Sequence, residues 1–166
     1  MVVLPELLAA NERYSASFDR GHLPMPPARK VAVLVCMDAR IDPAKALGLE
    51  EGDAHVIRNA GGRAAEALRS LAISQQLLGT REVVVIHHTD CGMLTFTNEQ
   101  IRATIATNLG DAAAGLANGL DFQPFPEVYQ SVRDDLAIIR SSALIMDVPV
   151  AGFVYDVQSG RLLPVE

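Results

Sequence analysis

Three residues have types and spacing suited to holding a metal ion: Cys36, His88 and Cys91. His88 and Cys91 lie three positions apart in one short segment, so that a nitrogen and a sulfur ligand can come from a single tight turn. Zinc favours a mixture of thiolate and imidazole ligands, and three protein ligands with a free fourth position are typical of catalytic sites. The sequence therefore predicts a catalytic Zn²⁺ site.

Residue type alone leaves other interpretations of the two cysteines open. Free cysteine is often a small buried core residue, and two thiols can also act as redox partners. A structural disulfide is disfavoured in a reducing cytoplasm. The segment 1–6 has no basic region and no long apolar region of a signal peptide, which predicts a cytoplasmic protein.

A second pair of chemically capable residues, Asp38 and Arg40, follows Cys36 at alternate positions. Alternate residues of an extended segment point to the same side, so all three side chains can face one site. The Asp38 carboxylate could bind the metal, accept a hydrogen bond from metal-bound water, or pair with Arg40. A bidentate arginine–carboxylate pair would hold Asp38 in place and keep it ionised. An ordinary surface ion pair is the alternative.

The elements that must position these residues alternate between strands and helices. Continuous apolar runs predict strands over 31–36, 54–58 and 82–86, and helical spacing predicts helices over 43–47, 64–78, 98–109 and 127–140. The segment 110–126 contains Gly, Asn and Pro and is interpreted as a loop, and 150–165 is interpreted as a terminal hairpin. Such alternation predicts an α/β fold with a mainly parallel sheet, whose carboxyl strand ends would bring both ligand segments to one edge.

The whole chain, 1–166, is expected to form a single zinc domain, and its first 28 residues are expected to form an N-terminal arm. In that arm a helix over 3–18 is followed by a Pro-rich connector. The net charge of −6 argues against a nucleic-acid partner. No apolar run is long enough to span a membrane, and no Gly-rich nucleotide-binding motif is present.

These motifs together resemble the β-class carbonic anhydrases. The order is C-x-D-x-R at 36–40, G-D-A-H-V-I-R-N-A-G at 52–61 and H-x-x-C-G at 88–92. The resemblance implies that Cys36, His88 and Cys91 bind zinc and that Asp38 and Arg40 form the catalytic dyad. It also implies reversible hydration of CO2 to bicarbonate and a proton through zinc-bound hydroxide. The implied fold is a mainly parallel sheet flanked by helices.

The resemblance further implies that the N-terminal helix packs on a partner subunit, in a homodimer or a tetramer of dimers. Arg58 and Asn59 match residues that brace the turn after their strand, and Gly92 matches a glycine that lets the backbone approach the metal. One departure concerns 24–28, where many members carry a Gln that contacts bicarbonate and this chain has none.

Two other functions stay open. A carbonyl sulfide or carbon disulfide hydrolase would keep the same zinc site and change the access channel. A non-catalytic zinc- or redox-responsive binding protein would use Cys36 and Cys91 as a switch.

Overall fold

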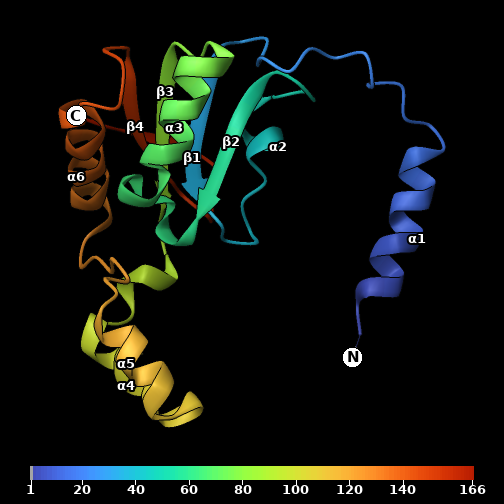
Figure 1. Cartoon of the computed structure of the whole chain (residues 1–166). Coiled ribbons are helices and arrows are strands. Elements are labelled where there is room, and N and C mark those ends of the chain that lie inside the picture. The colour runs from blue at the N-terminus through green and yellow to red at the C-terminus, as the bar shows by residue number, and fades with distance from the viewer. Residues whose placement is uncertain (1) are drawn as a thin grey trace.

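The fold is built on one five-stranded sheet in the order β2-β1-β3-β4-β5 (Figure 1). The computed structural model describes residues 2–166. The strands are β1 Val31–Cys36, β2 Ala54–Asn59, β3 Glu82–His88, β4 Val150–Tyr155 and β5 Leu162–Val165. The first four are parallel and β5 pairs antiparallel to β4. The predicted α/β class and mainly parallel sheet are confirmed.

Six α-helices are found among residues 2–166, together with two short 3₁₀ turns. The helices are α1 Leu4–Ser15, α2 Pro43–Leu47, α3 Ala64–Leu78, α4 Asn98–Leu109, α5 Asp111–Asn118 and α6 Val128–Ser141; the turns are η1 Ala60–Gly62 and η2 Gly92–Leu94. None of these helices has the length and apolar character needed to cross a lipid bilayer.

The two faces of the sheet carry separate apolar clusters. On one face α3 and α6 pack against each other and against the central strands (Figure 1), burying residues such as Leu34, Leu71 and Ile139. The other cluster includes Val33, Ile86 and both cysteines. Strand residues alternate between the two clusters because successive side chains of a strand point to opposite faces.

The interpretation of 110–126 as a loop was wrong, because that segment contains α5. Gly110 has φ +82 and separates α4 from α5. Beyond it, Asp111 and three alanines have the composition of a helix start: an acidic residue in the first turn, then the best helix former. The glycines and the later prolines of this segment outweighed that signal.

The N-terminal helix α1 stands apart from the sheet (Figure 1). It ends at Ser15, three residues before the predicted end, and none of its residues is buried. Tyr14 of this helix donates a hydrogen bond to Glu51, in the turn before β2. The packing of this helix on a partner subunit stays a prediction.

Candidate metal centre

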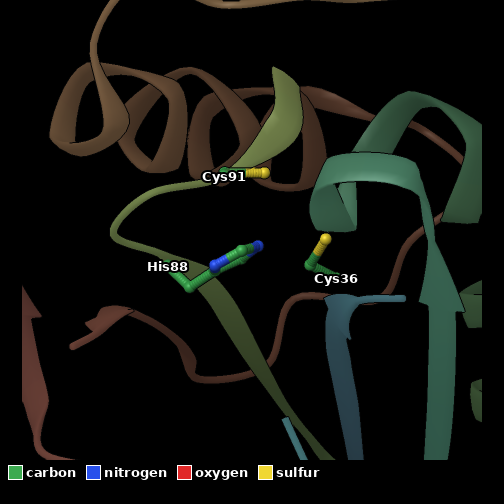
Figure 2. Close-up of side chains that lie close together, drawn as sticks. All are labelled: Cys36, His88 and Cys91. Atoms are coloured by element: carbon green, nitrogen blue, oxygen red, sulfur yellow. The ribbon is translucent and has the colours of Figure 1, made fainter. Parts of the chain in front are cut away.

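The structure brings Cys36, His88 and Cys91 together at one edge of the sheet (Figure 2). Their Sγ and imidazole nitrogen atoms all lie within 4.8 Å of one another, and all three residues are buried. Cys36 ends β1 and His88 ends β3. The strand β3 extends two residues beyond its predicted end at 86. Parallel neighbouring strands end at the same edge, and this places one sulfur beside the imidazole.

A glycine-rich turn, η1, closes against this edge. Gly62 has φ +70, and a Cβ there would lie 3.0 Å from the backbone nitrogen of Cys36 and 3.1 Å from the carbonyl carbon of Val35. A side chain would therefore collide with the backbone that carries the first ligand. The turn is also fixed by Asn59, whose side chain exchanges hydrogen bonds with the backbone of Arg63 at 2.6 and 2.9 Å.

The imidazole of His88 is oriented as a metal ligand. Its Nδ1 lies 2.9 Å from the Thr89 carbonyl oxygen, which can only accept, so Nδ1 carries the hydrogen. The opposite nitrogen, Nε2, is buried and has no hydrogen-bond partner among the described residues. A buried, unpartnered lone pair beside two thiols fits a zinc ion, for which a neutral imidazole and two thiolates are suitable ligands.

The charges of the three groups are strongly linked. A hydrogen bond from Cys91 lowers the pKa of Cys36 to about 4, and the same contact with burial raises the pKa of Cys91. Burial alone would lower the pKa of His88, but the neighbouring Cys36 thiolate and the Asp38 carboxylate raise it. The low pKa of Cys36 thus places a thiolate beside His88, at the position where a cation would bind.

Asp38 and Arg40 form a bidentate pair beside the cluster. Arg40 Nε lies 3.0 Å from Asp38 Oδ1, and Arg40 Nη2 lies 2.8 Å from Asp38 Oδ2. The Arg40 guanidinium holds the pKa of the Asp38 carboxyl well below its usual range. Asp38 Oδ2 is 3.7 Å from His88 Nε2, so the carboxylate lies at the border of the ligand cluster.

The backbone around this pair is braced by Arg58, which reaches the end of β1 and the loop after it and not the turn after its own strand. Arg58 donates from Nε to the Cys36 carbonyl oxygen at 3.1 Å and from Nη2 to the Asp38 carbonyl oxygen at 2.7 Å. No comparable constraint is found at Gly92, where a Cβ would meet no described atom within 4 Å. The described chain itself therefore gives no steric reason for the glycine.

A cavity of 840 Å³ opens over the cluster. Its walls are mainly apolar and include Met37, Ala60, Met93 and Phe96, while Asp38 and Arg40 supply polar groups. A small, uncharged substrate suits such walls, and the polar groups are placed to orient it.

A buried polar network, which was not predicted from the sequence, lies on the opposite side of β3 from the candidate metal centre. His87, next to His88, points to the opposite face, where its Nδ1 lies 2.6 Å from Ser131 Oγ and its Nε2 lies 3.0 Å from Asp135 Oδ2. Arg63 Nη2 lies 3.2 Å from the other Asp135 oxygen. Two consecutive histidines in a buried strand were the available signal, because one of them must face the helix layer and needs polar partners there.

The comparisons with known proteins agree with this geometry. A family model described as carbonic anhydrase matches residues 31–122. The β-carbonic anhydrase 1 of Mycobacterium tuberculosis is 43% identical over 164 residues, covering 98% of this chain and 97% of the relative. A carbon disulfide hydrolase of Saccharolobus solfataricus is 40% identical over 183 residues, covering 95% and 86%. The solved structure of a carbonic anhydrase from Glaciozyma antarctica superposes with a TM-score of 0.95 at 47% identity, covering 100% of both chains.

Proposed function

The chain belongs to the β-carbonic anhydrase family, and from that premise we propose that Cys36, His88 and Cys91 hold the zinc ion with which it reversibly hydrates carbon dioxide. The observation that carries this proposal is the buried His88 Nε2, which faces two thiols and has no hydrogen-bond partner among the described residues. When bound, zinc acts as a Lewis acid that brings the pKa of a water molecule towards neutrality and so provides hydroxide.

The remaining residues have separate tasks in this proposal. Arg40 keeps the Asp38 carboxylate ionised and turned to one side. Ionised Asp38 can only accept hydrogen bonds. It therefore orients the attacking oxygen by accepting a hydrogen bond from the O–H group of that oxygen. The apolar walls at Met37 and Phe96 admit a small uncharged substrate and limit competing water. The family thus supplies the reaction, and these residues supply its geometry.

Hydrolysis of carbonyl sulfide or carbon disulfide is the second candidate function. The relatives include carbon disulfide hydrolases, among them the one from Saccharolobus solfataricus. CO2 hydration is better supported, because the β-carbonic anhydrase relative matches at higher identity over nearly the whole of both chains.

Stopped-flow hydration of CO2, compared with sulfide release from carbonyl sulfide and carbon disulfide, tests the choice. We expect fast CO2 hydration by zinc-loaded protein and little sulfide release. Sulfide release with negligible CO2 turnover would refute carbonic anhydrase activity as the main function. Metal analysis of the purified protein tests the non-catalytic alternative, which requires zinc well below one ion per chain.

We also infer the setting in which the enzyme works. Free, buried cysteines used as metal ligands suit a reducing compartment, which supports the cytoplasm. The separate helix α1 supports a homodimer or a tetramer of dimers. We interpret the whole chain as one zinc domain with an N-terminal arm.

A further inference from the structure

Arg40 is held from two sides by two different segments of the chain. Asp38 binds its Nε and Nη2 atoms from within the same loop. Asp90, in the turn between the second and third candidate ligands, binds it from the other side. Asp90 Oδ2 lies 2.6 Å from Arg40 Nη1, and the Asp90 carbonyl oxygen lies 2.9 Å from Arg40 Nη2. The guanidinium therefore joins the loop after β1 to the turn after β3.

The backbone of Asp90 is adapted to this double contact. Its φ is +54, in the left-handed region that few residues other than Gly, Asn and Asp occupy. With this conformation the side chain and the carbonyl oxygen of Asp90 both reach Arg40.

The two contacts have different consequences for Asp38. Asp38 and Arg40 are two residues apart, so their pair is one unit within a single loop. The contact with Asp90 ties that unit to the turn that carries His88 and Cys91. Asp38 Oδ2 is only 3.7 Å from His88 Nε2. A carboxylate released from Arg40 would therefore need only a small movement to face the ligand cluster.

We propose that Asp90 is a positioning residue for the reaction, which fixes the Arg40 guanidinium and thereby keeps the Asp38 carboxylate turned away from the metal position. This inference rests on the proposed function. Asp90 acts through Arg40, and it contacts neither the substrate nor the metal.

Substitutions of Asp90 can separate its charge from its backbone conformation. Asp90→Gly removes the carboxylate contact with Arg40 Nη1, keeps the backbone carbonyl oxygen and tolerates the positive φ. Asp90→Asn also tolerates that φ and keeps an acceptor, but it removes the charge. Asp42→Asn is the matched control: it removes a nearby exposed carboxylate that caps α2, and Asn caps helices equally well.

The visible absorption of the cobalt-substituted protein is the main readout, because the spectrum of Co²⁺ responds to its set of ligands. Arg40→Met gives the reference spectrum for a protein in which no guanidinium holds Asp38. We expect Asp90→Gly to move the spectrum towards that reference and to lower kcat/KM about two- to fivefold, as for an exposed ion pair. The effect of Asp90→Asn should be smaller and in the same direction, and Asp42→Asn should resemble the unsubstituted protein.

A double substitution tests whether the effect passes through Asp38. In the Asp38→Asn background, Asp90→Gly should no longer change the cobalt spectrum. A spectral change that persists in that background, or an unchanged spectrum in Asp90→Gly alone, overturns the proposal. If Asp90→Gly binds no cobalt, Asp90→Asn decides, and an unchanged spectrum and unchanged kcat/KM then overturn it. Failure of the unsubstituted protein to hydrate CO2 would refute the proposed function, whereas the cobalt spectra would still decide the role of Asp90.

Discussion

The Asp38 carboxylate is ionised, held by Arg40 and placed 3.7 Å from a candidate ligand nitrogen. In Asp38→Asn an amide replaces the carboxylate, so the bidentate pair is lost and one face of the side chain becomes a donor. We expect the variant to bind zinc normally, since no ligand changes, and to lose CO2 hydration about a hundredfold or more. Stopped-flow hydration and zinc analysis on the same sample measure both quantities, with Asp42→Asn as control. Normal turnover would remove Asp38 from the mechanism.

At the same scale, residue chemistry made most of the metal centre predictable. Cys36, His88 and Cys91 could be singled out as candidate ligands because few residue types bind zinc and because the spacing of His88 and Cys91 suits a turn. Asp90 could not be identified in this way. An aspartate between two ligands has many roles open to it, and only the fold shows that its carboxylate and carbonyl oxygen both reach Arg40.

The turn η1 packs closely against the end of β1 because Gly62 has no side chain. We expect Gly62→Ala to lower the free energy of unfolding by about 2–4 kcal/mol, because the added Cβ combines a strained φ with a collision against the backbone of Cys36 and Val35. Gly79→Ala is the control, since Gly79 has a similar φ of +77 and open space for a Cβ. It should cost only about 1–2 kcal/mol.

Urea unfolding of the two glycine variants, with their zinc content, measures the difference. Because the collision at Gly62 lies at the first ligand, Gly62→Ala should also bind zinc more weakly, whereas Gly79→Ala should not. Equal destabilisation of the two variants would show that the close approach of η1 to β1 is unimportant.

The network of His87, Asp135 and Arg63 joins β3, α6 and the segment after η1. Asp135→Asn would leave the buried Arg63 charge without its counter-ion, and we expect a loss of about 3–5 kcal/mol in the free energy of unfolding. Asp135→Leu combined with Arg63→Met removes both charges and should cost less than Asp135→Asn alone. Chemical denaturation measures both variants. A double variant as unstable as the single one would contradict an ionic role for this pair.

The elements themselves were predictable where one pattern dominated. The strand over 31–36 was predicted with its observed bounds, because a continuous apolar run rich in valine is typical of a buried parallel strand. The helix α5 was missed because its glycines and the prolines beyond it favour a loop locally. Its packing against α4 overrides that preference: Arg102 of α4 donates to the carbonyl oxygens of Ala117 and Leu120 at the end of α5.

At the scale of the whole molecule, α1 is the element with the least packing, since none of its residues is buried. A helix of 12 residues has little stability of its own in water, and in this chain it buries no residue against the sheet. Leu4, Leu7 and Leu8 lie at helical spacing and are each more than half exposed. Covering such a stripe on a second copy of the chain would supply the packing that the helix lacks within one chain.

Introducing two negative charges into α1 tests the role of this arm directly. Leu7→Glu with Leu8→Glu places two charges in the apolar stripe, and burying them at an interface would be unfavourable. We expect sedimentation velocity to show a smaller oligomer, with zinc content unchanged because every candidate ligand lies elsewhere. Ala9→Glu with Ala10→Glu is the matched control, since it adds the same charges to the opposite face of the same helix and should leave the oligomer intact. If the leucine variant sediments like the unsubstituted protein, α1 does not hold the subunits together, and the interface must lie on the body of the fold.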